Sequence, residues 1–242
     1  MMRTIITIIY LFFFFLIGLP YMGIEYFLGK RNKEASDLRQ LRYVQWAFKT
    51  IMAISGIKLT VIGEENIPDD TAVLYVGNHR GIFDIVISYS RCKRLTGFVS
   101  KDSWAKVPLL SHWMKRLHCL FLNRDDIRAG LKTILEGIDL MKEGISIAIY
   151  PEGTRSKGDD YLDLLPFHEG SMKLATKSGC PIIPMAITET RDIFESHSPW
   201  IHRADVKLIY GKPIYPDQVD AETKKKLGAH VREEIIVLLK NA

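Results

Sequence analysis

The chain has 242 residues, of which 47% are hydrophobic and 25% are charged, and 33 Lys and Arg outnumber 28 Asp and Glu for a formal net charge of +5. This much apolar material excludes an intrinsically disordered chain. The three cysteines are odd in number and scattered, which excludes a disulfide scaffold. The positive excess is small and dispersed, so it suits an anionic surface or a phosphate-bearing substrate and does not indicate a nucleic-acid partner.

The N-terminal segment predicts a membrane anchor. Between Thr4 and Gly29 the only charged residue is Glu25, and about 20 apolar residues suffice to cross the hydrocarbon core of a bilayer. We expect Pro20 to break or kink the helix into pieces over 4–19 and 21–28, so the segment either spans the membrane or enters it and turns back. A cleaved signal peptide is the rival interpretation, but no small-residue cleavage site follows the apolar run.

Basic residues cluster directly after this apolar run: Lys30, Arg31, Lys33, Arg39 and Arg42. Because positive charge favours the cytoplasmic side of a membrane, this cluster places the following domain on the cytoplasmic face of the cell membrane. Apolar residues then recur at helical spacing from Leu38 to Met52 and predict an amphipathic helix. That helix either packs on its own domain or lies in the headgroup region, which Trp46 would suit.

From Ile57 onward, short apolar runs alternate with helical patterns, which predicts an α/β domain. The expected strands cover residues 57–62, 72–76, 95–99, 117–122, 145–150, 182–187 and 206–210. The expected helices run over 127–141, over 167–178 with Gly179 as the C-terminal cap, and over 227–239. We expect one largely parallel or mixed sheet of about seven strands, flanked by helices.

The simplest division of the chain follows from these patterns. Residues 1–30 form the membrane anchor, residues 31–56 the amphipathic helix, and residues 57–242 a single α/β domain.

A first candidate motif lies where the second predicted strand ends, in the run from Tyr75 to Asp84. Reactive groups in open α/β sheets sit at the carboxyl ends of strands, which is where His79 falls. Asp84 can fold back toward the imidazole, fix its tautomer and stabilise the imidazolium that forms when His79 accepts a proton. Taken alone, a histidine near a turn is more often a hydrogen-bonded structural residue.

A second candidate motif follows the strand predicted over 145–150, in the run from Tyr150 to Ser156. Arg155 can bind phosphate oxygens with two parallel hydrogen bonds, and Thr154 and nearby backbone amides add neutral donors. An ordinary turn with a solvated arginine is the alternative when this motif is taken singly.

Together, Asn78-His79-x4-Asp84 and the later Pro151–Ser156 segment resemble the 1-acylglycerol-3-phosphate O-acyltransferases, within the wider glycerolipid acyltransferase family. The resemblance covers the chain from about Ile57 to Tyr215. Two further blocks are also similar to the family: Phe121-Leu122-Asn123-Arg124 and Pro181-Ile182-Ile183-Pro184-Met185. Asn123 departs from the Asp that commonly precedes the arginine, which keeps a different lysophospholipid acceptor open.

The resemblance implies a reaction and a role for each residue. His79 would be the general base that deprotonates the free sn-2 hydroxyl of 1-acylglycerol-3-phosphate, with Asp84 orienting it. The alkoxide would attack an acyl thioester and give phosphatidic acid in phospholipid biosynthesis. The implied phosphate-binding residues are Lys101, Arg124, Thr154 and Arg155. Glu152 and Gly153 would organise the glycerol-binding turn, and a purely structural buried carboxylate is the alternative for Glu152.

Other features bear on the mechanism. No Gly-x-Ser-x-Gly nucleophile elbow is present and the cysteines lie in apolar surroundings, which favours direct transfer over an acyl-enzyme. The histidines lack metal-site spacing, so we expect no metal and no cofactor. His168 follows the second motif and could approach the site, but a structural role is favoured for it. The expected partners are lysophosphatidic acid, membrane lipid and an acyl thioester donor, with coenzyme A and acyl carrier protein both open as the acyl carrier.

Two alternatives in function remain at this point. One is a catalytically silent membrane protein that binds anionic lipid through Arg31, Arg39 and Arg42. The other is a membrane-anchored thioester hydrolase, which has no need for several cations around a phosphate.

Overall fold

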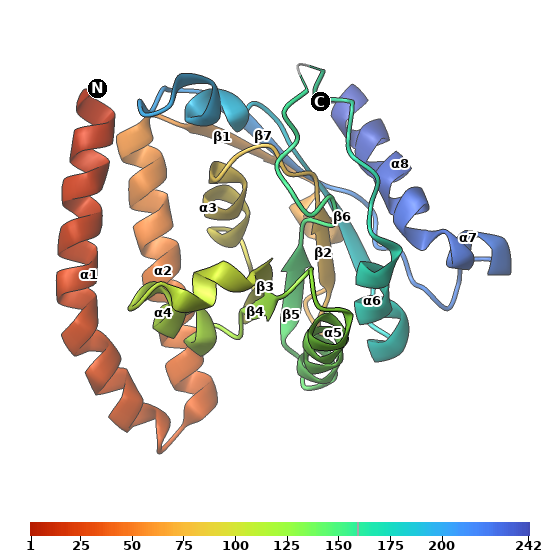
Figure 1. Cartoon of the computed structure of the whole chain (residues 1–242), viewed down its shortest axis with the longest axis horizontal. Coiled ribbons are helices and arrows are strands. Elements are labelled where there is room, and N and C mark those ends of the chain that lie inside the picture. Colours follow the sequence, from red (N-terminus) through yellow and green to blue (C-terminus); the bar gives the residue numbers. More distant parts are fainter. Residues whose placement is uncertain (159) are drawn as a thin grey trace. The chain divides into compact units, whose positions relative to one another are not determined.

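The computed structural model describes residues 1–158 and 160–242, which fall into two compact units (Figure 1). The first unit comprises Met1–Leu59, Gly81–Leu95 and Glu189–Val206, and the second comprises Thr60–Arg80, Thr96–Thr188 and Lys207–Ala242. Two long helices dominate the first unit, whereas most of a β-sheet and its covering helices make up the second.

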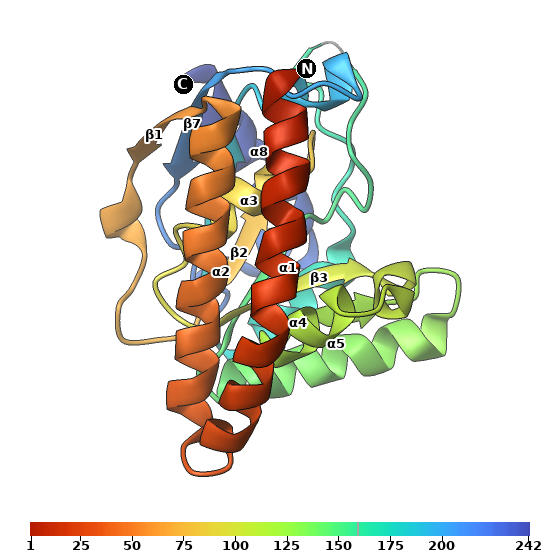
Figure 2. The same cartoon turned by 90° about the vertical axis from the view of Figure 1, so that its left-hand side faces the viewer.

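The first unit begins with a helical hairpin of α1 (Met2–Gly29) and α2 (Lys33–Ser55), which run side by side (Figure 2). The expected break at Pro20 is wrong, because α1 continues through it. The ring of Tyr43 on α2 stacks on Phe14 at 5.1 Å and on Tyr21 at 4.5 Å between centroids. These contacts hold α1 to the same partner helix on both sides of the proline and offset the lost backbone hydrogen bond.

A buried ion pair joins the two helices next to the turn that connects them. The carboxylate of Glu25, which is 2% exposed, accepts hydrogen bonds from Nε and Nη2 of Arg39 at 2.7 and 2.8 Å. Ser36 Oγ donates to the same carboxylate at 2.8 Å. The single acidic residue of α1 is therefore neutralised within the hairpin, and Arg39 is engaged there.

Most large apolar side chains of α1 are exposed, and the helix is long and apolar enough to cross a membrane. The predicted apolar N-terminal helix is thus confirmed. The amphipathic pattern of residues 38–52 falls inside α2, whose buried face packs on α3 (Phe83–Tyr89). Gln45 Nε2 fixes this packing by donating to the carbonyls of Tyr89 and Cys92 at 3.1 and 2.7 Å. Trp46, in contrast, is 55% exposed.

All seven predicted strands are present. They are β1 (Lys58–Ile62), β2 (Leu74–Gly77), β3 (Thr96–Lys101), β4 (Leu120–Leu122), β5 (Ser146–Ile149), β6 (Ile182–Ile187) and β7 (Asp205–Tyr210). They form one mixed sheet in the order β1-β7-β6-β2-β5-β3-β4. Pairing is parallel from β6 through β2, β5 and β3 to β4, whereas β7 runs antiparallel to β6. The expected α/β class is confirmed.

Strand β4 is shorter than the predicted 117–122, because helix α4 (Leu110–Arg116) precedes it and the chain then turns at His118 with φ of 57°. The backbone of this turn approaches β3 closely. A Cβ atom on Gly97 would lie 2.1 Å from the His118 carbonyl oxygen, so only glycine fits there.

Helices cover one face of the sheet in the second unit. They are α5 (Ile127–Lys142), α6 (Lys173–Ser178) and α8 (Leu227–Lys240), with the short α7 (Ala221–Lys225) before the last. The helix expected over 167–178 is instead a 3₁₀ turn, η3 (Glu169–Met172), followed by α6, which ends at Gly179 as predicted. Further short turns are η1 (Glu64–Asn66), η2 (Asp102–Lys106), η4 (Arg191–Ile193) and η5 (Glu195–His197).

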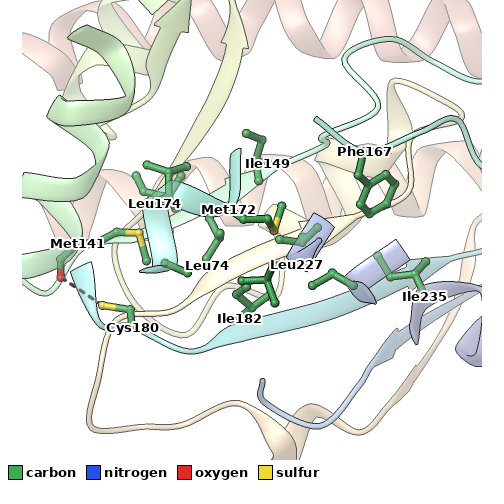
Figure 3. Close-up of a cluster of buried hydrophobic side chains, with 14 of the residues drawn as sticks. Leu74, Met141, Ile149, Phe167, Met172, Leu174, Cys180, Ile182, Leu227 and Ile235 are labelled. Atoms are coloured by element: carbon green, nitrogen blue, oxygen red, sulfur yellow. Dashed lines mark hydrogen bonds between the residues drawn. The ribbon is translucent and has the colours of Figure 1, made fainter. Parts of the chain in front are cut away.

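The hydrophobic core lies between these helices and alternate residues of the central strands (Figure 3). Leu74, Ile182 and Leu174 are fully buried in it. Helix α5 approaches this core closely at Gly137, where a Cβ atom would lie 2.6 Å from Leu174 Cδ2 and 2.8 Å from Leu120 Cδ1. The core fixes the central strands, and their carboxyl ends carry the candidate site.

Candidate active site

The predicted site residues of the second unit lie at or just after the carboxyl ends of neighbouring parallel strands. In sheet order, His79 follows β2, the segment from Glu152 to Arg155 follows β5, Lys101 ends β3 and Arg124 follows β4. Because β2, β5, β3 and β4 are all parallel, these four carboxyl ends face the same way. The fold therefore collects residues that are up to 76 positions apart between His79 and Arg155.

His79 is held by the turn that follows β5. Its backbone N–H donates to Oε1 of Glu152 at 2.7 Å, and its carbonyl accepts from the backbone N–H of Ser156 at 2.8 Å. Its imidazole stacks on the ring of Tyr150, with centroids 4.6 Å apart and planes 19° from parallel. The two motifs that the sequence singled out are thus joined through both the backbone and the ring of His79.

Glu152 is the residue that links these turns. It is 5% exposed, and its second oxygen, Oε2, accepts from the backbone N–H of Leu165 at 3.0 Å. Two amide donors satisfy a carboxylate that burial would otherwise penalise. This contact pattern is that of a carboxylate which organises the turns around His79.

The residues on either side of His79 also fix the chain. Asn78, 1% exposed, donates from Nδ2 to the Ile187 carbonyl at 3.0 Å and accepts from the Ile187 N–H at 2.9 Å. Arg80 Nη2 donates to the carbonyl of Gly158 at 2.5 Å. The sequence pattern predicts no role for Arg80, and Asn78 enters it only as the first residue of the motif.

Asp84 lies in the first unit, at the start of α3, and is fully buried. Its Oδ2 accepts from the backbone N–H of Gly81 at 2.9 Å, and its Oδ1 accepts from the hydroxyl of Thr190. A Cβ atom on Gly81 would lie 2.8 Å from the Thr190 carbonyl oxygen, so the turn requires glycine. The sequence did not predict this hydrogen bond from Thr190 to the carboxylate of Asp84. The pairing of Asp84 with His79 stays a prediction.

A pocket of about 250 Å³ lies beside the turn after β5. Arg124, Gly153 and His168 line it together with Tyr150. Lys101, Thr154 and Arg155 are exposed, and none of these three, all within the described residues, lines this pocket. The structure therefore brings Arg124 and Gly153 of the predicted set into one cavity, together with His168, which the sequence favoured as a structural residue that could approach the site.

Gly153 lies next to both the imidazole of His168 and the guanidinium of Arg124. Its φ is +74°, and a Cβ atom built on it would lie 3.2 Å from His168 Nε2 and 3.5 Å from Arg124 Nη1. A side chain at residue 153 would consequently be strained and would fill the space between the imidazole and the guanidinium.

Asn123 has a local structural role that does not require asparagine in place of aspartate. Its Oδ1 accepts from the backbone N–H groups of Asp125 and Asp126 at 2.9 and 3.1 Å, which shapes the turn between β4 and α5. An aspartate would accept the same two bonds. Asp126 then caps α5 by accepting from the amides of Arg128 and Ala129 at 2.9 and 3.0 Å.

The thiols are poorly suited to nucleophilic chemistry. Burial raises the pKa of Cys119 to about 11, and its Sγ accepts from the backbone N–H of Phe98 at 3.5 Å. Cys92 and Cys180 are buried. Within residues 1–158 and 160–242, no group of three or more His, Cys, Asp or Glu side chains has the arrangement of a metal site.

Comparison with known proteins identifies the family. The model of the acyltransferase family matches residues 58–188, which include both motifs and the strands β2 to β6. The chain belongs to the acyltransferase family.

The relatives carry a more specific name. The 1-acyl-sn-glycerol-3-phosphate acyltransferase of Borreliella burgdorferi is 31% identical over 188 residues, covering 78% of this chain and 74% of the relative. The chloroplastic 1-acyl-sn-glycerol-3-phosphate acyltransferase BAT2 of Brassica napus is 33% identical over 165 residues, or 67% of this chain. The match covers 47% of that longer plant protein.

A solved acyltransferase has the same fold. The crystal structure of the 1-acyl-sn-glycerophosphate (LPA) acyltransferase PlsC from Thermotoga maritima matches 100% of this chain and 99% of its own, with a TM-score of 0.78 and 24% identity. The match extends over the N-terminal hairpin as well as the sheet.

Proposed function

We propose that this acyltransferase moves a fatty acyl chain from an acyl thioester to the sn-2 hydroxyl of 1-acylglycerol-3-phosphate, which yields phosphatidic acid in phospholipid biosynthesis. The observation that carries the proposal is the seating of His79 on the turn after β5, beside a pocket that holds Arg124. A general base next to a cationic pocket suits an acceptor that has both a hydroxyl and a phosphate. The names of the relatives support this acceptor.

His79 acts as the general base in this mechanism. Its imidazole takes the proton from the sn-2 hydroxyl as the oxygen attacks the thioester carbonyl, and Asp84 stabilises the resulting imidazolium. The tetrahedral intermediate then collapses, the C–S bond breaks, and the leaving thiolate takes the proton from the imidazolium. The products are the ester and a free thiol, and His79 returns to its neutral state.

Direct transfer between the two substrates needs no acyl-enzyme. At neutral pH a thiol with a pKa of about 11 is almost entirely protonated, so Cys119 is a weak nucleophile. The free hydroxyl of the acceptor, activated by His79, takes the place of an enzyme nucleophile.

Cations at the sheet edge hold the acceptor phosphate. Arg124 does so from within the pocket, and Gly153 leaves the pocket open. Lys101 at the end of β3, and Thr154 and Arg155 in the turn after β5, are exposed, and we assign them to the same phosphate. Glu152 contributes by fixing the turn.

Helix α1 anchors the enzyme in the cell membrane, with residues 57–242 as the catalytic domain on the cytoplasmic face. Its exposed apolar surface and the burial of Glu25 against Arg39 support insertion into lipid. Residues 1–30 are the anchor and residues 31–56 the helix that follows it. The acyl donor is acyl-CoA or acyl-acyl carrier protein, and the reaction requires no metal or other cofactor.

The test is an assay of purified protein with lysophosphatidic acid and each acyl donor, with the product identified by mass spectrometry. We expect phosphatidic acid from the wild type, its loss in His79→Ala, and full activity in the control His112→Ala, which changes an exposed histidine on α4. Circular dichroism checks that both variants fold. Faster turnover of a lysophospholipid with a larger headgroup would reassign the acceptor, release of free fatty acid would indicate a hydrolase, and undiminished transfer by His79→Ala would refute the general base.

A further inference from the structure

His168 is the residue of the pocket that the proposed mechanism does not use. It lies at the start of η3, directly after the buried Phe167, and its own side chain is exposed. Its backbone is fixed on both sides: the N–H donates to the Pro151 carbonyl at 3.0 Å, and the carbonyl accepts from the Ser171 N–H at 3.0 Å. The imidazole is therefore presented from a well-anchored position next to the turn after β5.

The imidazole of His168 and the guanidinium of Arg124 both lie beside Gly153. Nε2 of His168 and Nη1 of Arg124 lie 3.2 and 3.5 Å from the single point where a Cβ atom of residue 153 would be. Two nitrogens that both lie this near to one point can donate hydrogen bonds to the same phosphate group. Both side chains are exposed, so an incoming ligand can reach them.

One acidic residue lines the same pocket. Asp126 contributes a carboxylate, but its Oδ1 accepts from the amides of Arg128 and Ala129 as the N-terminal cap of α5. Glu169, the next residue after His168, accepts hydrogen bonds at both carboxylate oxygens from the backbone amides of Gly228 and Ala229, at 2.8 and 3.1 Å. These acidic groups have structural partners of their own, which leaves the imidazole and the guanidinium for an anionic ligand.

We infer that His168 is a further phosphate-binding residue, which binds the phosphate monoester of the acceptor jointly with Arg124 in the pocket beside Gly153. This inference rests on the proposed function, since it assigns the pocket to the acceptor of that reaction. A phosphate group is also carried by the donor, either on coenzyme A or on the prosthetic arm of acyl carrier protein. The Michaelis constants of the two substrates separate these sources.

The kinetic test compares His168→Ala, His168→Lys and the control His112→Ala with the wild type. We expect His168→Ala to raise the KM for lysophosphatidic acid by about tenfold, while kcat and the KM for the donor change less than about twofold. His168→Lys, which places an ammonium donor at this position, is expected to restore most of the affinity. An unchanged acceptor KM would overturn the inference, as would an increase confined to the donor KM or a fall in kcat alone.

A binding test makes the inference independent of turnover. We expect sn-glycerol 3-phosphate to raise the Tm of the full-length wild-type protein in a concentration-dependent manner, with glycerol as the uncharged comparison. The stabilisation should be weaker in His168→Ala and retained in His112→Ala. If the wild type binds sn-glycerol 3-phosphate through His168 but transfers no acyl group, the proposed function fails and the phosphate site stands. Equal stabilisation of His168→Ala and wild type would eliminate the site.

Discussion

The carboxylate of Glu152, which follows β5, accepts a hydrogen bond of 2.7 Å from the backbone N–H of His79, which follows β2. A side chain thus fixes the position of the predicted base through its main chain, without touching the reacting atoms. The other carboxylate oxygen ties in the segment at Leu165. Glu152 is therefore a positioning residue whose two oxygens are both needed as acceptors.

The variant Glu152→Gln tests this role because glutamine has the same shape with only one acceptor oxygen. One of the two backbone amides would face an NH₂ group, and we expect His79 to shift. A displacement of the base of about 1 Å is expected to lower kcat by about 10- to 100-fold, with a small change in KM. Steady-state kinetics measure the split. The control is Glu136→Gln, an exposed carboxylate on α5, which should behave as wild type. A variant of Glu152 with normal kcat would show that this hydrogen bond does not position the base.

Tyr150 supports the imidazole of His79 by stacking on it. Two substitutions distinguish the contribution of its ring from that of its hydroxyl. Tyr150→Phe preserves the aromatic plane 4.6 Å from the His79 ring and should retain the larger part of kcat. Tyr150→Ala removes that plane and frees the imidazole, so we expect a loss of about tenfold or more in kcat. Stopped assays with both variants at saturating substrate test the ordering, and equal activities of the Phe and Ala variants would contradict it.

Asn78 contributes mainly to stability, since both ends of its buried amide bind the backbone of Ile187. Asn78→Ala leaves one donor and one acceptor without these partners, at about 1 to 3 kcal/mol each. We expect urea unfolding to show a loss of about 2 to 6 kcal/mol in the free energy of unfolding. The exposed Asn241 provides the matched control, because Asn241→Ala should change the unfolding free energy by less than about 0.5 kcal/mol.

The sequence predicted the sheet well because its central strands β2, β5 and β6 are buried on both faces. The run from Ile182 to Ile187 is fully buried, and its predicted bounds coincide with β6. Such continuous apolar runs between turn residues are typical of central parallel strands. The predicted helix break at Pro20 failed because stacking on Tyr43 across the hairpin outweighs the local penalty of proline. The sequence around Pro20 does not predict the stacking of Phe14 and Tyr21 on Tyr43.

The site was predictable in part for similar reasons. His79 and the turn after β5 were found because motifs at strand ends are local in sequence. The contacts around these motifs join residues that are distant in sequence. Glu152 accepts a hydrogen bond from Leu165 in an irregular segment, and His168 lines the same pocket as Arg124. These pairings depend on how the turns after β4 and β5 approach each other, which only the folded chain specifies.

Gly137 on α5 faces the core, so we expect its replacement by alanine to lower the free energy of unfolding. In an exposed helix, replacing glycine by alanine stabilises by up to about 1 kcal/mol. Here the added Cβ would lie 2.6 Å from Leu174 Cδ2, within a core where that leucine is fully buried. Overpacking of this kind costs about 1 to 3 kcal/mol, so we expect Gly137→Ala to be destabilised by about 1 to 2 kcal/mol. Urea unfolding decides the question, with the exposed Lys132→Ala on the same helix as the reference. A more stable Gly137→Ala protein would show that α5 packs less tightly than described.

The raised pKa of Cys119 predicts how stability depends on pH in the alkaline range. Burial moves the pKa of this thiol from 9.0 to about 11. Between these values the unfolded chain has released the thiol proton while the folded protein still holds it, so the unfolded state binds fewer protons and stability falls as pH rises. Tyrosine and lysine also titrate there, and the comparison that isolates the thiol is wild type against Cys119→Ala. The free energy of unfolding should fall more steeply in the wild type from pH 9 to pH 11, by about 1 to 3 kcal/mol in total, whereas any cavity left by the substitution shifts the Cys119→Ala curve equally at all pH values. Parallel curves would mean that the thiolate is tolerated in the folded protein, and Cys119 would then have to be reconsidered as a nucleophile.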